Sequence, residues 1–162
     1  MKFVIALGAN LGDCRRTLNE AVRLVSLEVG KVLKTSSFIE TEALVPVERE
    51  GEVQPSYLNG VVVCDAALTP QGVLDILLDI EKRLGRVRGV TDKRWGPRTI
   101  DLDLIAADSE IIETPTLTIP HPEMHKRLFV LVPMAEVYGE WLHPKHRKTV
   151  REMLKELKSQ ED

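Results

Sequence analysis

The chain has 162 residues, of which 43% are hydrophobic and 29% are charged, and this suits one globular domain with a single core. No apolar run approaches the roughly 18 residues that a membrane-spanning helix needs, so we expect no membrane association. The net charge of −3 lacks the basic bias of nucleic-acid-binding proteins, and the two distant cysteines favour a reducing, cytoplasmic setting over a disulfide framework.

The first half of the chain predicts a strand, a helix and two further strands. The near-continuous apolar run 3–7 predicts a central strand, and a glycine-containing turn leads to a helix that Asn10 or Asp13 can cap. Residues 32–41 and 57–64 predict strands, and the charged, aperiodic segment 42–54 between them predicts a long loop. The apolar face of the predicted helix consists of Leu18, Ala21, Val22, Val25 and Val29. Gly30 ends this helix.

The second half predicts a helix, a strand and a C-terminal helix. Thr69 and Pro70 are typical of a helix start, and Gly85 closes that helix. Residues 86–97 and 115–122 are expected to be irregular, whereas 99–107 predicts a strand onto which residues 110–112 can fold back as a hairpin. Thr149 and Glu152 have the spacing of a capping box, which predicts the start of a final helix.

The order of these elements is β-α-β-β-α-β, followed by a C-terminal helical extension. That order predicts an α+β fold with a ferredoxin-like core. We therefore expect an antiparallel-rich sheet with the two main helices on one face. Because no linker, repeat or low-complexity tract interrupts the chain, residues 1–162 are expected to form one domain.

The strongest chemical signal is Asp101-Leu102-Asp103. Residues i and i+2 of a strand share a face, so both carboxylates face the same side while Leu102 faces the core. The opposite assignment would bury two carboxylates, which is costly. Two hard oxygen ligands on one open face suit Mg²⁺, which prefers carboxylate, water and phosphate oxygens. The alternative is a pair of solvated acids at a sheet edge.

Positive charge is concentrated just before this pair. Between Lys82 and Arg98 seven cations are opposed by Asp92 alone, a net +6 that leaves −9 on the rest of the chain. Arginine matches phosphate oxygens in bidentate fashion, so the cluster suggests an anionic ligand such as a nucleotide phosphate. The alternative is simple neutralisation between acids and arginines. That alternative does not explain why Trp95-Gly96-Pro97 interrupts the cluster.

Other candidate ligand residues lie further away in the sequence. His121 is held between two prolines and can donate to a phosphate oxygen or cap a turn. Arg127 and Phe129 offer a phosphate contact and an aromatic wall, although a phenylalanine alone is more often a core residue. Tyr57 and Asn59 alternate onto one face of a strand, where Asn59 offers a donor and an acceptor to a planar heterocycle. No convergent metal spacing relates the remaining histidines, which are expected at the surface: His125, His143 and His146.

Taken together, these residues resemble the 6-hydroxymethyl-7,8-dihydropterin pyrophosphokinase family. The resemblance runs from Ala6-Leu7-Gly8-Ala9-Asn10-Leu11-Gly12 to Phe129-Val130-Leu131-Val132-Pro133. Its most specific part is Gly85-Arg86-Val87-Arg88 followed by Arg94-Trp95-Gly96-Pro97-Arg98-Thr99-Ile100-Asp101-Leu102-Asp103. One departure is the run after Thr41, which lacks the Pro and Gly usual in the family.

The resemblance implies a reaction in folate biosynthesis, in which the β,γ-diphosphate of ATP passes to the hydroxymethyl group of the pterin and AMP leaves. It implies two Mg²⁺ ions held by Asp101 and Asp103, with Arg86 and Arg98 engaging the phosphates during transfer. The implied ATP contacts are Arg88, Arg94, Trp95, Leu104, Thr118, His121 and Arg127. The implied pterin contacts are Thr41, Leu44, Tyr57, Asn59, Phe129 and Trp95, of which Trp95 would seal the site as its loop closes.

Two other functions remain as alternatives, the first of them on the same fold. An RRM-like nucleic-acid-binding module needs stacking aromatic residues on its central strands, and the strands at 3–7 and 57–64 lack that pattern. A different Mg²⁺-dependent nucleotidyl- or phosphotransferase could use the same aspartates, but the expected pterin pocket argues against it. The expected partners are therefore the small molecules ATP and a reduced pterin, with the chain a monomer or a weak homodimer.

Overall fold

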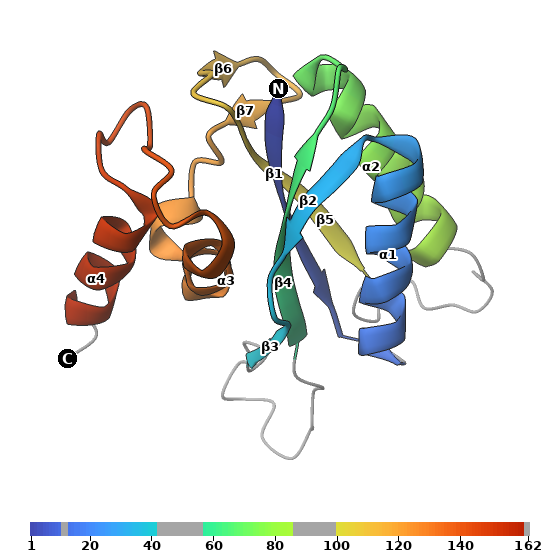
Figure 1. The fold of residues 1–162 in the computed structure, drawn as a ribbon, viewed down its shortest axis with the longest axis horizontal. Coiled ribbons are helices and arrows are strands. Elements are labelled where there is room, and N and C mark those ends of the chain that lie inside the picture. The colour runs from blue at the N-terminus through green and yellow to red at the C-terminus, as the bar shows by residue number, and fades with distance from the viewer. Residues whose placement is uncertain (11–12, 42–56, 86–99, 161–162) are drawn as a thin grey trace.

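The computed structural model describes residues 1–10, 13–41, 57–85 and 100–160. Within these ranges the chain forms a five-stranded sheet whose neighbouring strands run antiparallel (Figure 1). The strands are β1 (Lys2–Ala9), β2 (Lys31–Thr35), β3 (Ile39–Thr41), β4 (Tyr57–Asp65) and β5 (Asp101–Ala107). Their order is β2-β4-β1-β5, and β3 pairs with the other end of β4.

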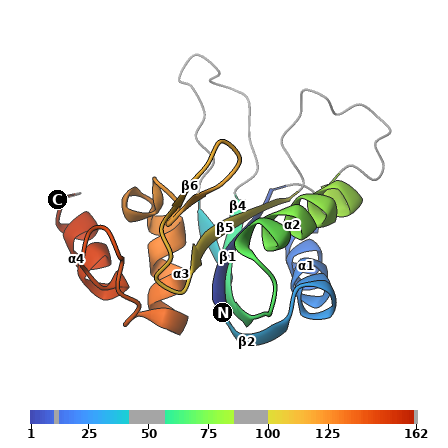
Figure 2. The ribbon, with the colours of Figure 1, turned by 90° about the horizontal axis from the view of Figure 1, so that it is seen from above.

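Two pairs of helices enclose the sheet. The helices are α1 (Cys14–Glu28), α2 (Pro70–Gly85), α3 (Leu128–Tyr138) and α4 (Val150–Gln160). Helices α1 and α2 lie together on one face, while α3 and α4 lie on the opposite side (Figures 1 and 2). The expected mixed fold, with an antiparallel sheet and two main helices on one face, is confirmed. No helix in the described ranges has both the length and the apolarity needed to cross a membrane.

Strand β1 is apolar almost throughout because both of its faces are buried. Phe3, Ile5 and Leu7 pack into the core beneath α1 and α2. Val4 and Ala6 point the other way, into a second core shared with α3 and α4. A strand covered on both sides loses the alternation of a half-exposed strand, which is why the sequence signal was a continuous apolar run.

The first two helices begin at the caps that the sequence indicated. The Asp13 carboxylate accepts a hydrogen bond from the Arg16 N–H at 3.2 Å, and the Thr69 hydroxyl accepts one from the Gly72 N–H at 3.0 Å. Each bond satisfies one of the amides that a helix leaves unpaired at its start. Asn10, the other candidate cap of the first helix, is fully buried.

The predicted single strand over 32–41 is wrong, because the chain bends between β2 and β3. At the bend the Ser36 N–H donates to the Val61 carbonyl at 2.9 Å. The Val61 N–H donates in turn to the Ser36 hydroxyl, also at 2.9 Å, instead of to a backbone carbonyl. A side-chain hydroxyl thus replaces a backbone carbonyl as the acceptor of one hydrogen bond between the strands. This competition between the side chain and the backbone interrupts the strand.

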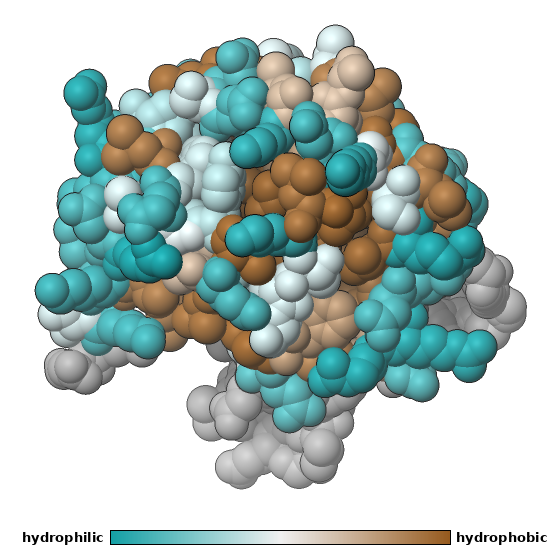
Figure 3. All heavy atoms as spheres, in the orientation of Figure 1, coloured by the Kyte–Doolittle hydropathy of each residue, from teal (hydrophilic) through white to brown (hydrophobic). Residues whose placement is uncertain are grey.

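Strand β2 forms an edge of the sheet and is largely exposed. Apolar surface gathers over it at the middle of the face drawn in Figure 3, with hydrophilic side chains around it. Leu33 is one exposed apolar residue of β2, at 39%. Lys31 and Lys34 are exposed on the same strand, and lysines on an edge strand discourage pairing with another sheet.

The predicted hairpin of 110–112 onto the preceding strand is also wrong. Instead, β6 (Ile112–Glu113) pairs with β7 (Thr118–Ile119), inside the segment expected to be a loop. The reason is the turn between them, which is closed by two hydrogen bonds. The Thr114 N–H donates to the Leu117 carbonyl at 2.9 Å, and the Leu117 N–H donates to the Thr114 hydroxyl at 3.0 Å.

Helix α3 had no counterpart among the elements placed in the sequence. Its residues are apolar apart from Glu136 and Tyr138, so no clear helical period marks it, and Pro133 lies within it. The helix is instead stabilised by burial, since Val130, Leu131 and Met134 belong to the second core. It follows the short 3₁₀ helix η2 (Met124–Lys126).

Helix α4 begins with the predicted capping box. The Thr149 N–H donates to the Glu152 carboxylate at 2.8 Å, and the Glu152 N–H donates to the Thr149 hydroxyl at 3.1 Å. Each residue thereby satisfies an amide of the other, as this motif requires.

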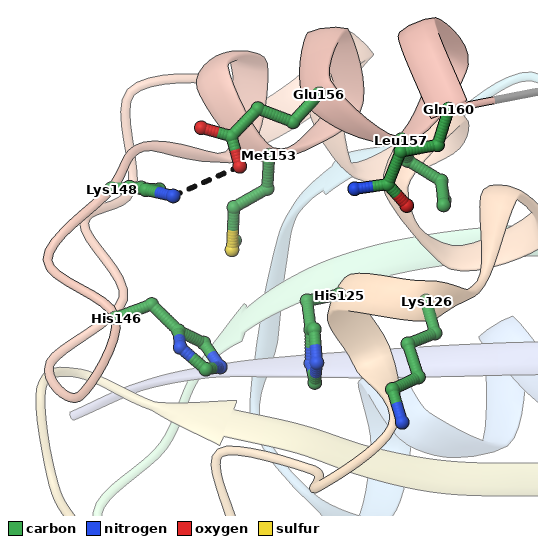
Figure 4. A pocket seen from close by; sticks show the side chains of 8 residues that line it. All are labelled: His125, Lys126, His146, Lys148, Met153, Glu156, Leu157 and Gln160. Carbon is green, nitrogen blue, oxygen red and sulfur yellow. Dashed lines mark hydrogen bonds and ion pairs between the residues drawn. The ribbon is translucent and has the colours of Figure 1, made fainter.

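Three histidines gather beside α4, and the expectation that all are surface residues is wrong for His143. Its side chain is only 3% exposed, and its Nδ1 accepts hydrogen bonds from the N–H groups of Lys145 and His146, both at 3.1 Å. The His146 ring centroid lies 4.3 Å from that of His143 and 4.5 Å from that of His125. Figure 4 shows His125 and His146 lining a pocket of about 250 Å³ beneath α4.

This cluster predicts a loss of stability in acid. Burial lowers the pKa of His143 to about 4 from 6.5, and the nearby His146, His125 and Lys145 add to the shift. Between these two pH values the unfolded chain binds more protons than the folded chain, so stability falls as pH falls. We predict a contribution of about 1–3 kcal/mol to the loss in free energy of unfolding between about pH 7 and pH 4.5.

Urea unfolding across this pH range measures the effect, with His143→Asn as the comparison. The asparagine oxygen can still accept the two backbone hydrogen bonds, but it does not titrate. The difference between the wild-type and variant curves should therefore change between pH 6.5 and pH 4. Parallel curves would contradict the assignment to His143.

Candidate active site

The Asp101–Asp103 pair lies where the strand period placed it. Leu102 and Leu104 of β5 are buried in the core beneath α1 and α2. Asp101 and Asp103 are half-buried and belong to the opposite face of the same strand. Both carboxylates therefore share one partly open face of the sheet.

Strand β1 places an asparagine beside these acids. In the sheet register Gly8 of β1 lies opposite Asp101 on one side and opposite Asn59 of β4 on the other. A Cβ atom at Gly8 would lie 2.9 Å from the Asn59 Oδ1, closer than an ordinary contact. The glycine is thus required by the close approach of the Asn59 amide, which lies across β1 from Asp101.

The Asn59 side chain is fixed by a neighbour on β3. Its Nδ2 donates a hydrogen bond to the Thr41 hydroxyl at 2.8 Å, and the residue is only 6% exposed. Thr41 itself lies opposite Tyr57 in the pairing of β3 with β4. The structure therefore brings together three residues that the sequence analysis placed in one pocket: Thr41, Tyr57 and Asn59.

His121 lies against the outer edge of β5, where its N–H donates to the Ile105 carbonyl at 2.8 Å. Burial lowers the pKa of His121, and the positive charge of Arg127 acts in the same direction, while Asp103 opposes both. The His121 Nδ1 accepts the Glu123 N–H at 3.1 Å. In the neutral ring the proton therefore lies on Nε2, which can donate to a phosphate oxygen.

Arg127 and Phe129 stand at the start of α3. The guanidinium carbon of Arg127 is 5.6 Å from the centre of the Phe129 ring, within the range of a cation–π contact. Phe129 is 36% exposed, so this phenylalanine is not a core residue. Thr118, another predicted ligand residue, is exposed on β7.

Glu81 on α2 supports the aspartate pair and was not predicted from the sequence. Its carboxylate accepts a hydrogen bond from the Leu102 N–H at 2.6 Å. That amide lies between the two aspartates, so Glu81 holds the backbone from which both acids project. The local sequence gives no signal of this contact, because a glutamate on an amphipathic helix usually faces solvent.

Several predicted ligand residues are not placed with the site. The Leu104 side chain is only 4% exposed in the core behind the sheet, so only its backbone can contact a ligand on the Asp103 face. Six others lie outside the described residues: Leu44, Arg86, Arg88, Arg94, Trp95 and Arg98.

The chain is similar to known proteins in both sequence and fold. Residues 4–139 match the family described as 7,8-dihydro-6-hydroxymethylpterin-pyrophosphokinase (HPPK). The chain is 45% identical to the 2-amino-4-hydroxy-6-hydroxymethyldihydropteridine pyrophosphokinase of Bacillus subtilis, over 82% of this chain and 75% of that protein. It is 39% identical to the protein of the same name from Haemophilus influenzae, over 94% of this chain and 91% of that protein.

A solved structure shares the fold. The wild-type HPPK-DHPS of Plasmodium falciparum aligns with 98% of this chain at a TM-score of 0.74 and 16% identity. The chain spans 45% of the length of that protein.

The close approach at Gly8 gives a testable prediction. The methyl group of Gly8→Ala would displace the Asn59 amide from Thr41, and overpacking of this kind costs about 1–3 kcal/mol of unfolding free energy. Urea unfolding measures the cost, and amide NMR spectra report whether the Asn59 side chain moves.

Gly85→Ala is the matched control. A Cβ atom at Gly85 would lie 3.7 Å from the Ile100 Cγ2, an ordinary contact at the end of α2. This variant should keep the stability of the wild-type protein. An unshifted Asn59 resonance in Gly8→Ala would show that the close approach does not hold the amide.

Proposed function

The chain belongs to the 7,8-dihydro-6-hydroxymethylpterin-pyrophosphokinase family, and from this membership we propose that it transfers the β,γ-diphosphate of ATP to 6-hydroxymethyl-7,8-dihydropterin in folate biosynthesis. The observation that carries the proposal is the position of two carboxylates, Asp101 and Asp103, across β1 from the Asn59–Thr41 pair. A phosphate site and a site for a planar heterocycle thereby share one face of the sheet.

In the proposed reaction the hydroxymethyl oxygen of the pterin attacks the β-phosphorus of ATP. A bond forms between this oxygen and the β-phosphorus, and the hydroxyl releases its proton to solvent. The bond from the β-phosphorus to the oxygen that bridges to the α-phosphate breaks, and its electron pair leaves with AMP. Such a displacement depends on in-line positioning of the attacking and leaving oxygens, which groups on a rigid sheet can provide.

Asp101 and Asp103 fit the proposed pair of Mg²⁺ ions. Both are half-buried oxygen donors on one strand face, and no group of three or more potential metal ligands occurs among the described residues. A site with few protein ligands suits Mg²⁺, which commonly completes its shell with water and substrate phosphates. Bound ions would neutralise charge on the phosphate oxygens during transfer. Glu81 keeps the acids in place by holding the Leu102 amide between them.

The proposed pterin pocket lies between β4 and the start of α3. Because one Nδ2 hydrogen of Asn59 is donated to Thr41, the orientation of the amide is fixed, and its Oδ1 can accept from a ring N–H of the pterin. Tyr57 and the exposed ring of Phe129 offer faces on which the pterin can stack. Leu44 and Trp95, outside the described residues, complete the proposed pocket.

The proposed ATP contacts combine a neutral donor with several cations. His121 offers its Nε2–H, and Arg127 offers a guanidinium group beside it, as expected for a phosphate subsite. Thr118, which is exposed on β7, and the backbone of Leu104 on β5 are further proposed contacts. The remaining proposed contacts, from the cluster before Asp101, are Arg86, Arg88, Arg94 and Arg98.

We further propose that the core is ferredoxin-like and that residues 1–162 form one domain. The strand order β2-β4-β1-β5, with α1 and α2 on one face, supports this arrangement, in which α3 and α4 form the C-terminal extension. A cytoplasmic protein that acts on small molecules, as a monomer or weak homodimer, fits the charge and composition.

The product of the reaction distinguishes this function from that of an ordinary kinase. Incubation of the chain with ATP, Mg²⁺ and the hydroxymethyl-dihydropterin should release AMP in equal amount to the diphosphorylated pterin, which ³¹P NMR can follow. The 6-methyl analogue lacks the attacking oxygen and should give no AMP. Formation of ADP would show transfer of one phosphate and contradict the proposal.

Neutralising the carboxylate of either Asp101 or Asp103 should abolish turnover without unfolding the chain. For Asp101→Asn or Asp103→Asn we predict a loss in kcat of about 10³-fold or more, because each change weakens metal and phosphate binding in the transition state. Circular dichroism and thermal melting check the fold. Asp75→Asn on α2 is the control, since the exposed Asp75 contacts Gln71 only through an oxygen that asparagine keeps. Full activity in both site variants would contradict the metal assignment.

A further inference from the structure

The bend between β2 and β3 is connected to helix α3 by one carboxylate. The Ser37 N–H donates to the Glu136 Oε1 at 2.9 Å, and the Ser37 hydroxyl donates to the Glu136 Oε2 at 3.1 Å. Both carboxylate oxygens of Glu136 are thus engaged by one residue that lies 99 positions away in the sequence. Hydrogen bonds to an ionised acceptor are stronger than those between neutral groups.

Because of the bend, the Ser37 N–H is available for a hydrogen bond outside the sheet. Ser36 follows Thr35, the last residue of β2 that pairs with β4, and its backbone and its hydroxyl both bond to Val61. The Ser36 hydroxyl also donates to the Ser37 carbonyl at 2.8 Å, which fixes the turn. The Ser37 N–H is directed to α3 instead of to the sheet, and Glu136 is its acceptor.

The two ends of this connection carry opposite walls of the proposed pterin pocket. On one side, β3 follows the bend and presents Thr41, which fixes the Asn59 amide. On the other side, α3 presents Phe129 in its first turn, and Glu136 lies about two turns later on the same side of the helix. The Glu136–Ser37 contact therefore links the residues that read the edge of the pterin to a ring on which it stacks.

We infer that Glu136 is a positioning residue that sets the spacing between Phe129 and the Asn59–Thr41 pair. The inference rests on the proposed function, since it assigns the pocket to the pterin. Glu136 touches no reacting atom in this account. Its effect acts on pterin binding and leaves the phosphate subsite, at Asp101 and Asp103, unchanged.

The contact requires a carboxylate of this length. Ser37 offers two donors, and a carboxylate offers two acceptor oxygens. In Glu136→Gln one oxygen becomes an NH₂ group, which cannot accept and would face a second donor. Because Glu136 and Ser37 are exposed, water and salt weaken the contact, and its loss should have a moderate effect.

Steady-state kinetics with both substrates tests the inference. For Glu136→Gln we expect the pterin KM to rise about three- to tenfold, with kcat and the KM for ATP within about twofold of wild type. Ser37→Ala removes only the hydroxyl bond and should raise the pterin KM less. The double variant should resemble Glu136→Gln alone, because both changes act on one contact.

Glu140→Gln is the matched control for a charge lost beyond the end of α3. Glu140 is exposed and pairs with Arg151, away from the bend, so this variant should keep all three kinetic constants. Pterin affinity, measured by titration in the presence of an unreactive ATP analogue, should fall in Glu136→Gln in parallel with the rise in KM. Glu136→Asp, which keeps the charge but is shorter, should recover part of the affinity.

Two results would overturn the inference while leaving the proposed function intact. The first is a pterin affinity of the Glu136→Gln variant that equals the affinity of the wild-type protein. The other is a parallel change in kcat and both KM values together with a lower melting temperature, which indicates a purely structural role. If instead the wild-type chain forms no pterin-dependent AMP, the proposed function fails and this inference fails with it.

Discussion

The alternation of side chains along β5 is the constraint on which the rest of the site depends. Leu102 and Leu104 are buried against α1 and α2, so Asp101 and Asp103 must face the other way. A slip of one residue in the register with β1 would turn both carboxylates into the core, where unpaired charges are costly. The hydrophobic effect on one face of the sheet thereby fixes the chemistry of the other.

Within the described residues, apolar packing covers the second face of the sheet along only part of its length. Helices α3 and α4 bury Val4, Ala6 and Val61 in the second core. Gly8 of β1, with Asn59 and Asp101 beside it, lies further along the same strands, where polar side chains replace apolar ones. The candidate site therefore begins where the second core ends, so that each polar group is attached to strands anchored by packing.

The sequence predicted those helices and strands that are marked by a regular hydrophobic period or by a capping motif. The capping box of Thr149 and Glu152, the cap at Thr69 and the strand period around Leu102 all appear as expected. Patterns could not reveal α3, because a helix that is apolar almost throughout has no polar face to mark it. They also missed the bend at Ser36, where a hydroxyl competes with the backbone for β4.

The strand positions of the candidate site residues could be predicted from the sequence, but their supporting contacts could not. Asp101, Asp103 and Asn59 could be grouped because strand alternation and family resemblance both indicate them. Glu81 and Glu136 bind amides that are distant in the sequence. From the sequence alone, such a glutamate cannot be distinguished from one on a helix that is only solvated. His143 was misplaced for a similar reason, since its burial depends on how the segment before α4 folds back.

The most direct test of the central claim is to locate the divalent ion on the sheet. Mn²⁺ can replace Mg²⁺ beside an unreactive ATP analogue, and its unpaired electrons broaden the NMR signals of nearby amides. The account predicts the strongest broadening at residues 101–103 and at Gly8, with little effect at Met153 on α4. Broadening centred on the histidine pocket around His125 and His146, with sharp signals at β5, would contradict it.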